Sequence, residues 1–219
     1  MGLKHSYWKM KKIPKQKPTF EYESQLWNKG LEYIAGVDEV GRGCFAGPVV
    51  AAAVILPSGF FATDKINDSK KLSAKVRKEL STVIKNYALA FAIAEVSVSV
   101  INQIGIGKAA QQAFVNAING LEIQPEHILI DAFMISALQK TKQTAIIHGD
   151  GISISIAAAS IIAKVYRDEL MERLHDDYKM YDFFTNKGYG TKKHRDAIGK
   201  YGLCDLHRTS FDLIKFLTT

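Results

Sequence analysis

The sequence predicts an α/β fold in which a mixed β-sheet carries helices on its faces. Three strand-like segments occur in the first half of the chain, at residues 33–38, 49–56 and 88–98. Helical and strand-like segments alternate after them, which is the pattern of a sheet covered by helices. Hydrophobic residues make up 47% of the 219 residues, which suffices for the core of one domain of ordinary size.

Residues 1–30 differ in composition from the rest and are expected to form a basic N-terminal arm. Six lysines precede the first acidic residue, Glu21. Pro14 and Pro18 disfavour regular structure, whereas residues 21–30 could form a short helix. Two roles stay open for the arm: nonspecific contacts with phosphates, or a solvated tail without a task.

Residues 31–219 are expected to form one catalytic domain, whose strands stand out as apolar runs. Residues 49–56 are so continuously apolar that both faces of this strand should be buried, and the Pro-Ser-Gly sequence after them ends it. Residues 127–131 and 144–147 add two short strands. The sheet is therefore expected to mix early strands with strands reached through helices.

Four segments of this domain have helical spacing: residues 72–86, 102–119, 155–174 and 194–201. Ser73 is a favourable N-cap for the first of them. Gly120 and Gly202 are expected to end the second and the fourth. The last helix belongs to a small helical C-terminal part at about residues 190–219.

Four carboxylates close or follow predicted strands: Asp38, Glu39, Asp131 and Asp150. If these strands are neighbours, their ends bring the four side chains together, as ligand sites in such sheets require. Each buried charge loses hydration and repels the others, and a divalent cation offsets both penalties. Oxygen ligands favour Mg²⁺ or Mn²⁺, and two such ions would activate water and stabilise the leaving oxygen of a phosphodiester.

Asp38 and Glu39 are adjacent, and successive strand residues point to opposite faces. One of them is therefore expected to sit where the strand turns into the loop of residues 41–43, whose glycines let backbone approach a ligand closely. An alternative stays open for Asp131 and Asp150, because an acidic residue after a strand is often a helix cap or a turn former.

The net charge and the cysteine spacing restrict the possible functions and the cellular location further. Lys and Arg number 29 against 22 Asp and Glu, and the pI is about 9.2. This balance favours a nucleic-acid partner, although an indifferent basic surface is the alternative. Cys44 and Cys204 lack the spacing of a disulfide scaffold or a zinc site. No apolar run reaches the roughly 20 residues that a membrane-spanning helix needs, and the N-terminal residues do not have the pattern of a secretory signal. A cytoplasmic location is expected.

Four sequence blocks, in order, resemble the ribonuclease HII (type 2 ribonuclease H) family. They are VDEVGRG with AGPVV at 37–50, NDSKKLS at 67–73, GD with SIAAASIIAKV and RD at 149–168, and KGYGTKKH at 187–194. The Gly-Arg-Gly form is closer to type HII than to the sister ribonuclease HIII. Three positions depart from the family pattern: Cys44 replaces a common proline, His148 a usual lysine, and Gly151 a frequent serine.

The resemblance implies a ribonuclease H-like fold and a metal-dependent endonuclease. Such an enzyme hydrolyses the RNA strand of RNA/DNA hybrids and cuts 5′ to single ribonucleotides embedded in duplex DNA. It leaves 3′-hydroxyl and 5′-phosphate ends and serves DNA repair and replication. We expect it to use two Mg²⁺ or Mn²⁺ ions and to act as a monomer.

The resemblance also assigns site residues. By this resemblance, the metal-binding catalytic acids are Asp38, Glu39, Asp131 and Asp150, and the ribose-sensing loop is Gly41, Arg42 and Gly43. Tyr189 corresponds to the tyrosine that stacks on the sugar, and Lys70 and Lys71 correspond to the phosphate-contacting lysines. Reading a 2′-hydroxyl needs backbone groups brought close, which the two glycines permit. Without the resemblance, Tyr189 would be an ordinary partly buried tyrosine and Lys70-Lys71 a solvated helix start.

Two other functions stay open. A nuclease or resolvase of related fold acting on DNA alone would share the acids but would not need the Gly-Arg-Gly loop or Tyr189. A nucleic-acid-binding module with purely structural acids would bind duplex with a steep salt dependence and release no product. Comparing all-DNA with ribonucleotide-containing duplex separates these functions.

Overall fold

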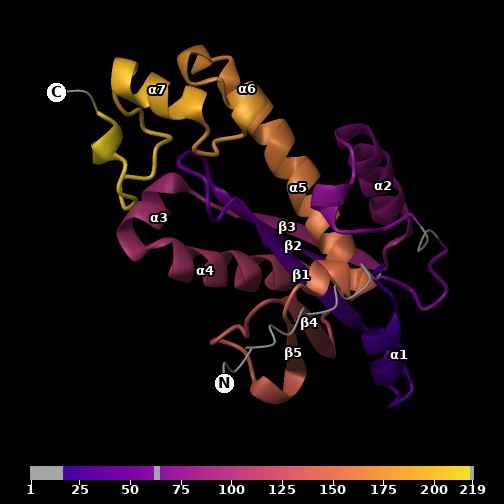
Figure 1. Ribbon diagram of the computed structural model, residues 1–219. Helices are drawn as coiled ribbons and strands as arrows, with labels where there is room; N and C mark the ends of the chain where they lie inside the picture. The colour runs from indigo at the N-terminus through magenta and orange to yellow at the C-terminus, as the bar shows by residue number, and fades with distance from the viewer. Residues whose placement is uncertain (1–16, 62–64, 218–219) are drawn as a thin grey trace, which may run out of the picture.

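The computed structural model describes residues 17–61 and 65–217, so most of the predicted basic arm, residues 1–16, lies outside the described residues. The described residues form a five-stranded sheet of order β3-β2-β1-β4-β5 with helices on both faces (Figure 1). The strands are β1 Ile34–Val40, β2 Val49–Ile55, β3 Ala90–Val96, β4 His127–Asp131 and β5 Gln143–Ile146. The predicted mixed α/β sheet is confirmed.

Strand directions in the sheet are mixed as well. β1, β2 and β3 pair antiparallel, whereas β4 runs parallel to β1 and to β5. All seven residues of β2 are buried, as the continuous apolar run predicted. In the β1–β4 register Val37 pairs with Ile130, so the next residues, Asp38 and Asp131, stand at neighbouring positions at one edge of the sheet.

Two apolar layers cover the sheet. On one face, β-strand residues such as Val37 and Ala51 pack with Phe114 of α4 (Ile106–Asn119). On the other face, the alternate residues of β2 pack with α2 (Ala74–Tyr87) and α5 (Ile154–His175). Figure 1 shows α4 and α5 on opposite sides of the strands. Ser73 caps α2 as predicted, because its hydroxyl accepts a hydrogen bond from the amide of Val76.

The predicted helix over residues 102–119 is wrong in one respect, because the chain forms two helices there. α3 spans Val98–Ile104 and α4 begins at Ile106. Gly105 lies between them with φ of 80°, a left-handed backbone conformation that an α-helix cannot continue through. Ser97 caps α3 by accepting from the amide of Val100, so the helix begins earlier than its apolar spacing suggested.

Strand β1 and helix α5 are in direct backbone contact. A Cβ atom added to Gly36 would lie 2.0 Å from the carbonyl carbon of Ser155, which no side chain tolerates. Side chains on this face of β1 therefore meet α5 directly. Asp38, two residues beyond Gly36 on the same face, consequently points toward Ser160 of α5.

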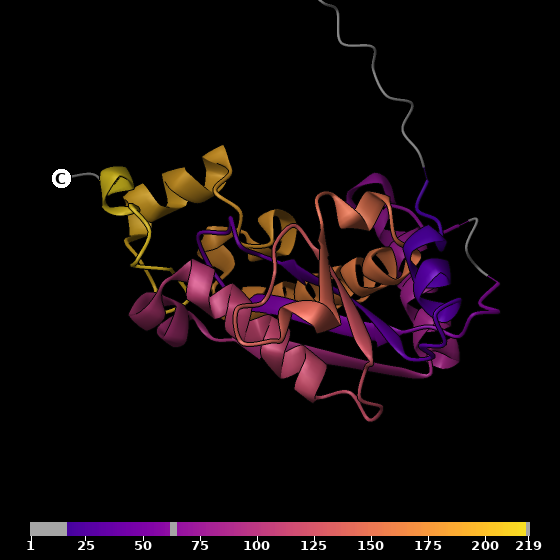
Figure 2. The same ribbon diagram turned by 90° about the horizontal axis from the view of Figure 1, so that it is seen from below.

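The two ends of the described chain lie at opposite ends of the molecule (Figures 1 and 2). Helix α1 spans Glu21–Trp27, inside the segment predicted to be helical. Helices α6 (Phe183–Asn186) and α7 (Lys192–Tyr201) form the C-terminal part, and Gly202 ends α7 as predicted. Within the described ranges, none of the helices combines the length and the apolar character needed to span a membrane.

Candidate active site

The candidate site begins where β1 extends beyond its pairing with β4. The β1–β4 register ends at Val37, whereas β1 continues beside β2 as far as Val40. Asp38 and Glu39 therefore both lie inside the strand, and the expectation that one of them sits in the following turn is wrong. The pairing with β2 keeps the backbone extended through both residues. Both residues nevertheless line one cavity of about 260 Å³.

Asp38 is the most deeply placed acid of the group, with 4% of its surface exposed. Burial and the neighbouring charges of Glu39 and Asp131 hold the pKa of Asp38 well above its ordinary value, although a hydrogen bond from Ser160 acts in the opposite direction. Asp150 adds to the repulsion. The carboxylates predicted to meet are thus close enough to affect one another.

Asp131 and Asp150 are joined through one turn. The amide of Gly149 donates to Oδ1 of Asp131 at 2.7 Å, and Asp150 is the next residue, inside the short 3-10 turn Gly149–Gly151. Burial raises the pKa of Asp131, with the Gly149 hydrogen bond opposing it and the charge of Asp150 reinforcing it. Lys70 approaches from the other side, its Nζ 3.0 Å from Oδ2 of Asp150.

Glu39 has one paired and one unpaired oxygen. Its Oε1 accepts from Arg42 at 3.2 Å, while its buried Oε2 has no hydrogen-bond partner among the described residues. Burial raises the pKa of Glu39, and the Arg42 guanidinium only partly offsets this. In the described part of the chain, no three His, Cys, Asp or Glu side chains stand close enough to hold a metal ion as they are. Arg42 and Lys70 neutralise two of the acids instead.

The two glycines of the loop after β1 have different surroundings. Gly41 has φ of 96°, and a Cβ there would lie 2.4 Å from Nε of Arg167, so a buried side chain uses the space that the missing Cβ leaves. Gly43 has open space around it. Arg42 lies over the ring of Phe133 at 4.7 Å.

The two predicted lysines have different partners. Lys70 reaches Asp150, and this hydrogen bond and charge raise the pKa of Lys70, although desolvation of its ammonium group acts in the opposite direction. Lys71 instead pairs with Asp68 at 3.4 Å, so the structure does not bring Lys71 to the acids.

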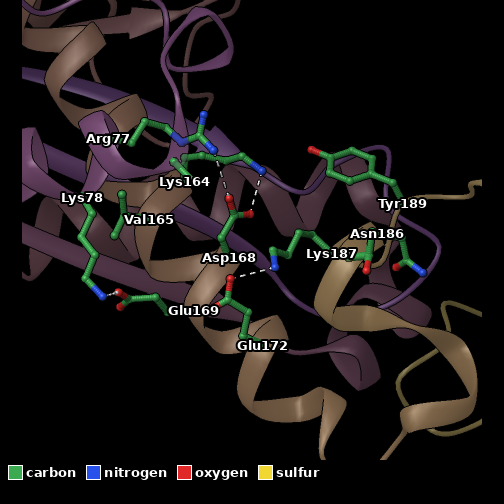
Figure 3. Close-up of a pocket in the computed structure, with 12 residues that line it drawn as sticks. Arg77, Lys78, Lys164, Val165, Asp168, Glu169, Glu172, Asn186, Lys187 and Tyr189 are labelled. Carbon is green, nitrogen blue, oxygen red and sulfur yellow. Dashed lines mark hydrogen bonds and ion pairs between the residues drawn. The ribbon is translucent and has the colours of Figure 1, made fainter.

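Tyr189 lines the same cavity as Asp38 and Glu39 and is 39% exposed. Its ring faces Nζ of Lys164 at 5.7 Å, an arrangement visible in Figure 3. Burial and the neighbouring thiol of Cys44 raise the pKa of Tyr189 to about 12, so the phenol keeps its proton at neutral pH. A half-exposed aromatic face thus lies beside the acids.

Comparison with known proteins identifies the family. The profile of the family described as Ribonuclease HII matches residues 35–214. The chain belongs to the ribonuclease HII family. It is 52% identical over 190 residues to ribonuclease HII of Oceanobacillus iheyensis, covering 87% of this chain and 72% of that protein. Ribonuclease HII of Acholeplasma laidlawii is 50% identical, with 87% and 92% covered. The chain is therefore an endoribonuclease of the ribonuclease H class and a hydrolase, acting on RNA/DNA hybrids.

Solved structures have the same fold. Ribonuclease H2 from Pyrococcus horikoshii superimposes with a TM-score of 0.69 at 23% identity, covering 84% of this chain and 95% of that one. Ribonuclease HII from Archaeoglobus fulgidus, solved in a complex with PCNA, gives 0.68 at 26% identity, with 80% and 92% covered. The predicted ribonuclease H-like sheet with flanking helices is confirmed.

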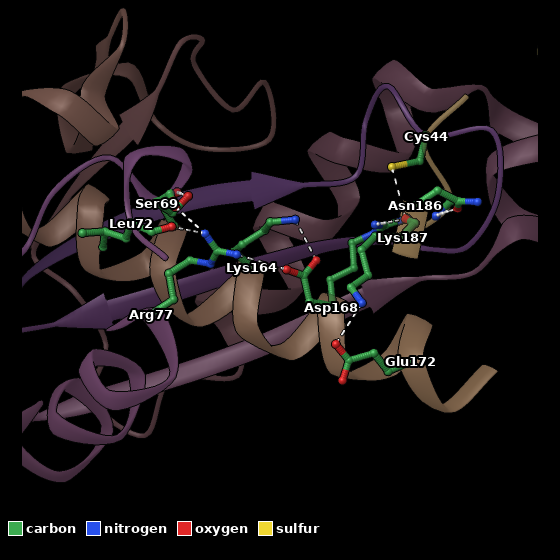
Figure 4. A network of polar contacts seen from close by, with 12 residues as sticks. Cys44, Ser69, Leu72, Arg77, Lys164, Asp168, Glu172, Asn186 and Lys187 are labelled. Atoms are coloured by element: carbon green, nitrogen blue, oxygen red, sulfur yellow. Dashed lines mark hydrogen bonds and ion pairs between the residues drawn. The ribbon is translucent and has the colours of Figure 1, made fainter. Parts of the chain in front are cut away.

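This ribonuclease HII also has a polar network beside the acids that the sequence reasoning missed. Asp168 of α5 accepts from Lys164 at 2.7 Å and lies 3.7 Å from Arg77 of α2, which also donates to the carbonyl of Ser69 (Figures 3 and 4). Lys164 and Asp168 are four residues apart within the third block, a spacing that predicts an ion pair on a helix. The network lines a cavity of about 420 Å³ that shares Tyr189 with the acid site.

Two fully buried arginines hold the glycine loop of this ribonuclease HII in place. Arg167 donates to the carbonyls of Ala46, Pro48 and Lys187 at 2.8–3.0 Å. Arg208 donates to the carbonyls of Gly47 and Arg42. Among the described residues no carboxylate pairs with either, and burial lowers the pKa of Arg208 to about 10. Arg167 lies in the third sequence block, whereas no local pattern marks Arg208, because its acceptors are distant carbonyls.

Proposed function

We propose that this ribonuclease HII uses divalent metal ions to cut the RNA strand of RNA/DNA hybrids and the 5′ side of single ribonucleotides in duplex DNA. Water attacks phosphorus and the bond to the 3′ oxygen breaks, which leaves 3′-hydroxyl and 5′-phosphate ends. The carrying observation is that acids from two strands and one turn share an edge of the sheet beside Tyr189. We further propose that the enzyme acts as a monomer, in the cytoplasm, in DNA repair and replication.

The acids suit a hard divalent cation. All four donors are carboxylates, and such oxygen sets favour Mg²⁺ or Mn²⁺. Asp38, Glu39 and Asp131 would hold the ions, with Asp150 completing a second position. The unpaired Oε2 of Glu39 is an oxygen available for coordination. The raised pKa values of Asp38 and Asp131 show the cost of burying these charges, which a cation relieves.

When bound, such ions would activate the attacking water and stabilise the leaving oxygen. The solved structure of a ribonuclease HIII, described as Bst-RNase HIII in complex with Mn²⁺, has the same fold, with a TM-score of 0.68 at 20% identity over 84% of this chain and 68% of that one. That fold accommodates a divalent ion in the related protein.

Substrate selection would come from the glycine loop and the tyrosine. The 2′-hydroxyl is the group that distinguishes RNA from DNA, and the backbone of Gly41, Arg42 and Gly43 lies beside the acids to contact it. Tyr189 offers its exposed ring face to the sugar at the ribo–deoxy junction. Lys70, whose side chain is 76% exposed, would contact a phosphate next to Asp150, and Lys71 one farther from the acids.

One cleavage experiment tests this function. The protein is incubated with Mg²⁺ or Mn²⁺ and three duplexes of the same sequence: an RNA/DNA hybrid, a DNA duplex with one ribonucleotide, and an all-DNA duplex. We expect a single cut 5′ to the ribonucleotide and no cut in all-DNA. Intact ribonucleotide substrate in both metals would refute the proposal, and equal cutting of all-DNA would favour the DNA nuclease.

Two variants tie the cleavage to the acids. Asp131→Asn should abolish turnover and leave the fold intact, because it removes one charge at the site and keeps the side-chain shape. Glu122→Gln is the matched control, since Glu122 is an exposed acid on the loop before β4. An active Asp131→Asn variant would refute the proposal that Asp131 holds a catalytic metal ion.

A further inference from the structure

Glu23 of α1 is a fully buried acid that lies outside the carboxylate cluster. None of its surface is exposed, and it precedes the residues that the family profile matches. Its Oε1 accepts two hydrogen bonds, from the hydroxyl of Ser153 at 2.6 Å and from the amide of Ser155 at 2.9 Å. Its Oε2 is buried without a hydrogen-bond partner in the described residues. A buried carboxylate without a cationic partner is costly, so its placement calls for a compensating role.

Glu23 forms its hydrogen bonds with groups at the N-terminal end of α5. The hydroxyl of Ser153 caps this helix by accepting from the amide of Ile156 at 3.2 Å, and Glu23 satisfies the amide of Ser155 in the same turn. The first amides of a helix have no partner within it, and the helix dipole favours negative charge there. Glu23 and Ser153 together therefore fix where α5 starts and how it is oriented.

The same contacts continue into the acid site. The amide of Ser153 donates to the carbonyl of Gly149 at 2.8 Å, and the amide of Gly149 donates to Oδ1 of Asp131 at 2.7 Å. Asp150 lies in the turn between Gly149 and Ser153. A chain of hydrogen bonds thus runs from Glu23 through Ser153 and Gly149 to Asp131 at the end of β4, and it passes through the turn that carries Asp150.

A second set of contacts ties the same turn to the segment around α1. The amide of Thr19 donates to the carbonyl of Ile152 at 2.9 Å, and the amide of Ile154 donates to the carbonyl of Thr19 at 3.1 Å. Apolar residues of α1, including Leu26 and Trp27, pack against the ends of the neighbouring strands and α5. The turn that carries Asp150 is consequently held from outside the sheet as well as from within it.

We propose that Glu23 is a positioning residue for the metal site: through Ser153 and the turn of residues 149–153 it sets the places of Asp150 and Asp131. This inference rests on the proposed function, because it assumes that these two acids hold the ions. Residues that orient metal ligands through hydrogen bonds commonly change metal affinity 10–100-fold when they are replaced. Helix α1 then contributes to the position of the metal ligands from outside the sheet.

Direct Mn²⁺ binding tests the proposal independently of cleavage. Free Mn²⁺ is followed by electron paramagnetic resonance while the full-length protein is titrated, and cleavage of the single-ribonucleotide duplex is measured against Mg²⁺ concentration. Glu23→Ala should weaken Mn²⁺ binding about tenfold and raise the half-saturating Mg²⁺ concentration by a similar factor. Glu23→Gln keeps an acceptor oxygen for Ser153 and Ser155 and should restore most of the affinity.

Two controls separate positioning from general loss of stability. Glu21→Gln removes a charge from an exposed position of the same helix and should leave Mn²⁺ affinity unchanged. Leu80→Ala opens a cavity where α2 packs in the apolar core and lowers stability, while Leu80 takes no part in the hydrogen-bond chain. If Leu80→Ala weakens Mn²⁺ binding as much as Glu23→Ala, the proposal is overturned.

The outcomes distinguish this proposal from the function it rests on. If the wild-type protein binds no Mn²⁺, the proposed metal-dependent function fails. If the wild type binds Mn²⁺ and cuts, but Glu23→Ala binds equally well, the positioning role fails alone. Should Glu23→Ala not fold, Ser153→Ala decides instead: a several-fold loss of Mn²⁺ affinity supports the role, and an unchanged affinity overturns it.

Discussion

Asp38→Asn should stabilise the metal-free protein while abolishing its activity. Asp38 and Asp131 occupy neighbouring positions on adjacent strands, which lie about 4.8 Å apart. Burial is the largest cause of the raised pKa of Asp38, and the charge of Glu39 adds to it. From Asp131 alone, two charges at about this separation repel by about 3 kcal/mol at an effective dielectric constant of about 20. Asparagine keeps an acceptor for the hydroxyl of Ser160 but loses the charge-assisted part of that bond, about 1 kcal/mol. A net gain of about 2 kcal/mol remains.

The gain should depend on pH in a defined direction. Because the folded protein raises the pKa of Asp38 above that of the unfolded chain, folding carries the full penalty only at pH values above the folded pKa, where the group is ionised in both states. The penalty fades as pH falls through the folded pKa and is gone below the unfolded value of 3.8. The advantage of Asp38→Asn therefore grows as pH rises through the folded pKa and shrinks toward acid pH.

Thermal unfolding in the presence of a chelator measures this effect. A gain of about 2 kcal/mol corresponds to a rise of about 4–8 °C in Tm for a chain of this size. The difference between variant and wild type is taken at each pH, because other groups, such as His207, also titrate. Added Mn²⁺ should raise the Tm of the wild type more than that of the variant. A variant no more stable than the wild type at pH 8 would refute the electrostatic reasoning.

Three further outcomes are expected. Gly36→Ala forces a Cβ into the backbone of Ser155 and should destabilise the protein by about 3 kcal/mol in urea unfolding; a neutral effect would contradict the β1–α5 contact. Tyr189→Ala should slow cleavage at a single ribonucleotide about tenfold, with Tyr189→Phe near wild type because the ring remains; equal losses in both would exclude stacking. Burial lowers the pKa of His207 to about 4, so stability should fall as pH drops from about 6.5 through about 4, and His207→Gln should flatten Tm over this range.

Local patterns in the sequence predicted most of the fold. The strand at residues 127–131 was predicted with its observed bounds, and β2 to within one residue, because apolar runs and turn residues are local signals. The break at Gly105 was missed, since apolar spacing continues across it and only the backbone angle reveals it. The persistence of β1 through Glu39 was also missed, because it depends on pairing with β2.

The candidate site could be predicted where its residues carry their own signal. Asp38 and Asp131 each follow an apolar run in the sequence, and the structure places them at neighbouring positions of β1 and β4. In the sequence Lys71 looked equivalent to Lys70, yet in the structure Lys71 pairs with Asp68 and does not reach the four acids. The burial of Glu23 could not be predicted from the sequence, because nothing local distinguishes it from a surface acid. Its partners, Ser153 and Ser155, lie far away along the chain at the start of α5.

Arg208 joins the last part of the chain to a loop far earlier in the sequence. The carbonyl of Arg42, one of its acceptors, precedes it by 166 positions, yet belongs to the loop proposed to sense ribose. A substitution that displaces Arg208 would therefore alter discrimination between RNA and DNA without changing any acid. For the same reason, grafting the C-terminal helices of a relative onto this sheet would succeed only if the graft also supplied an arginine to those carbonyls.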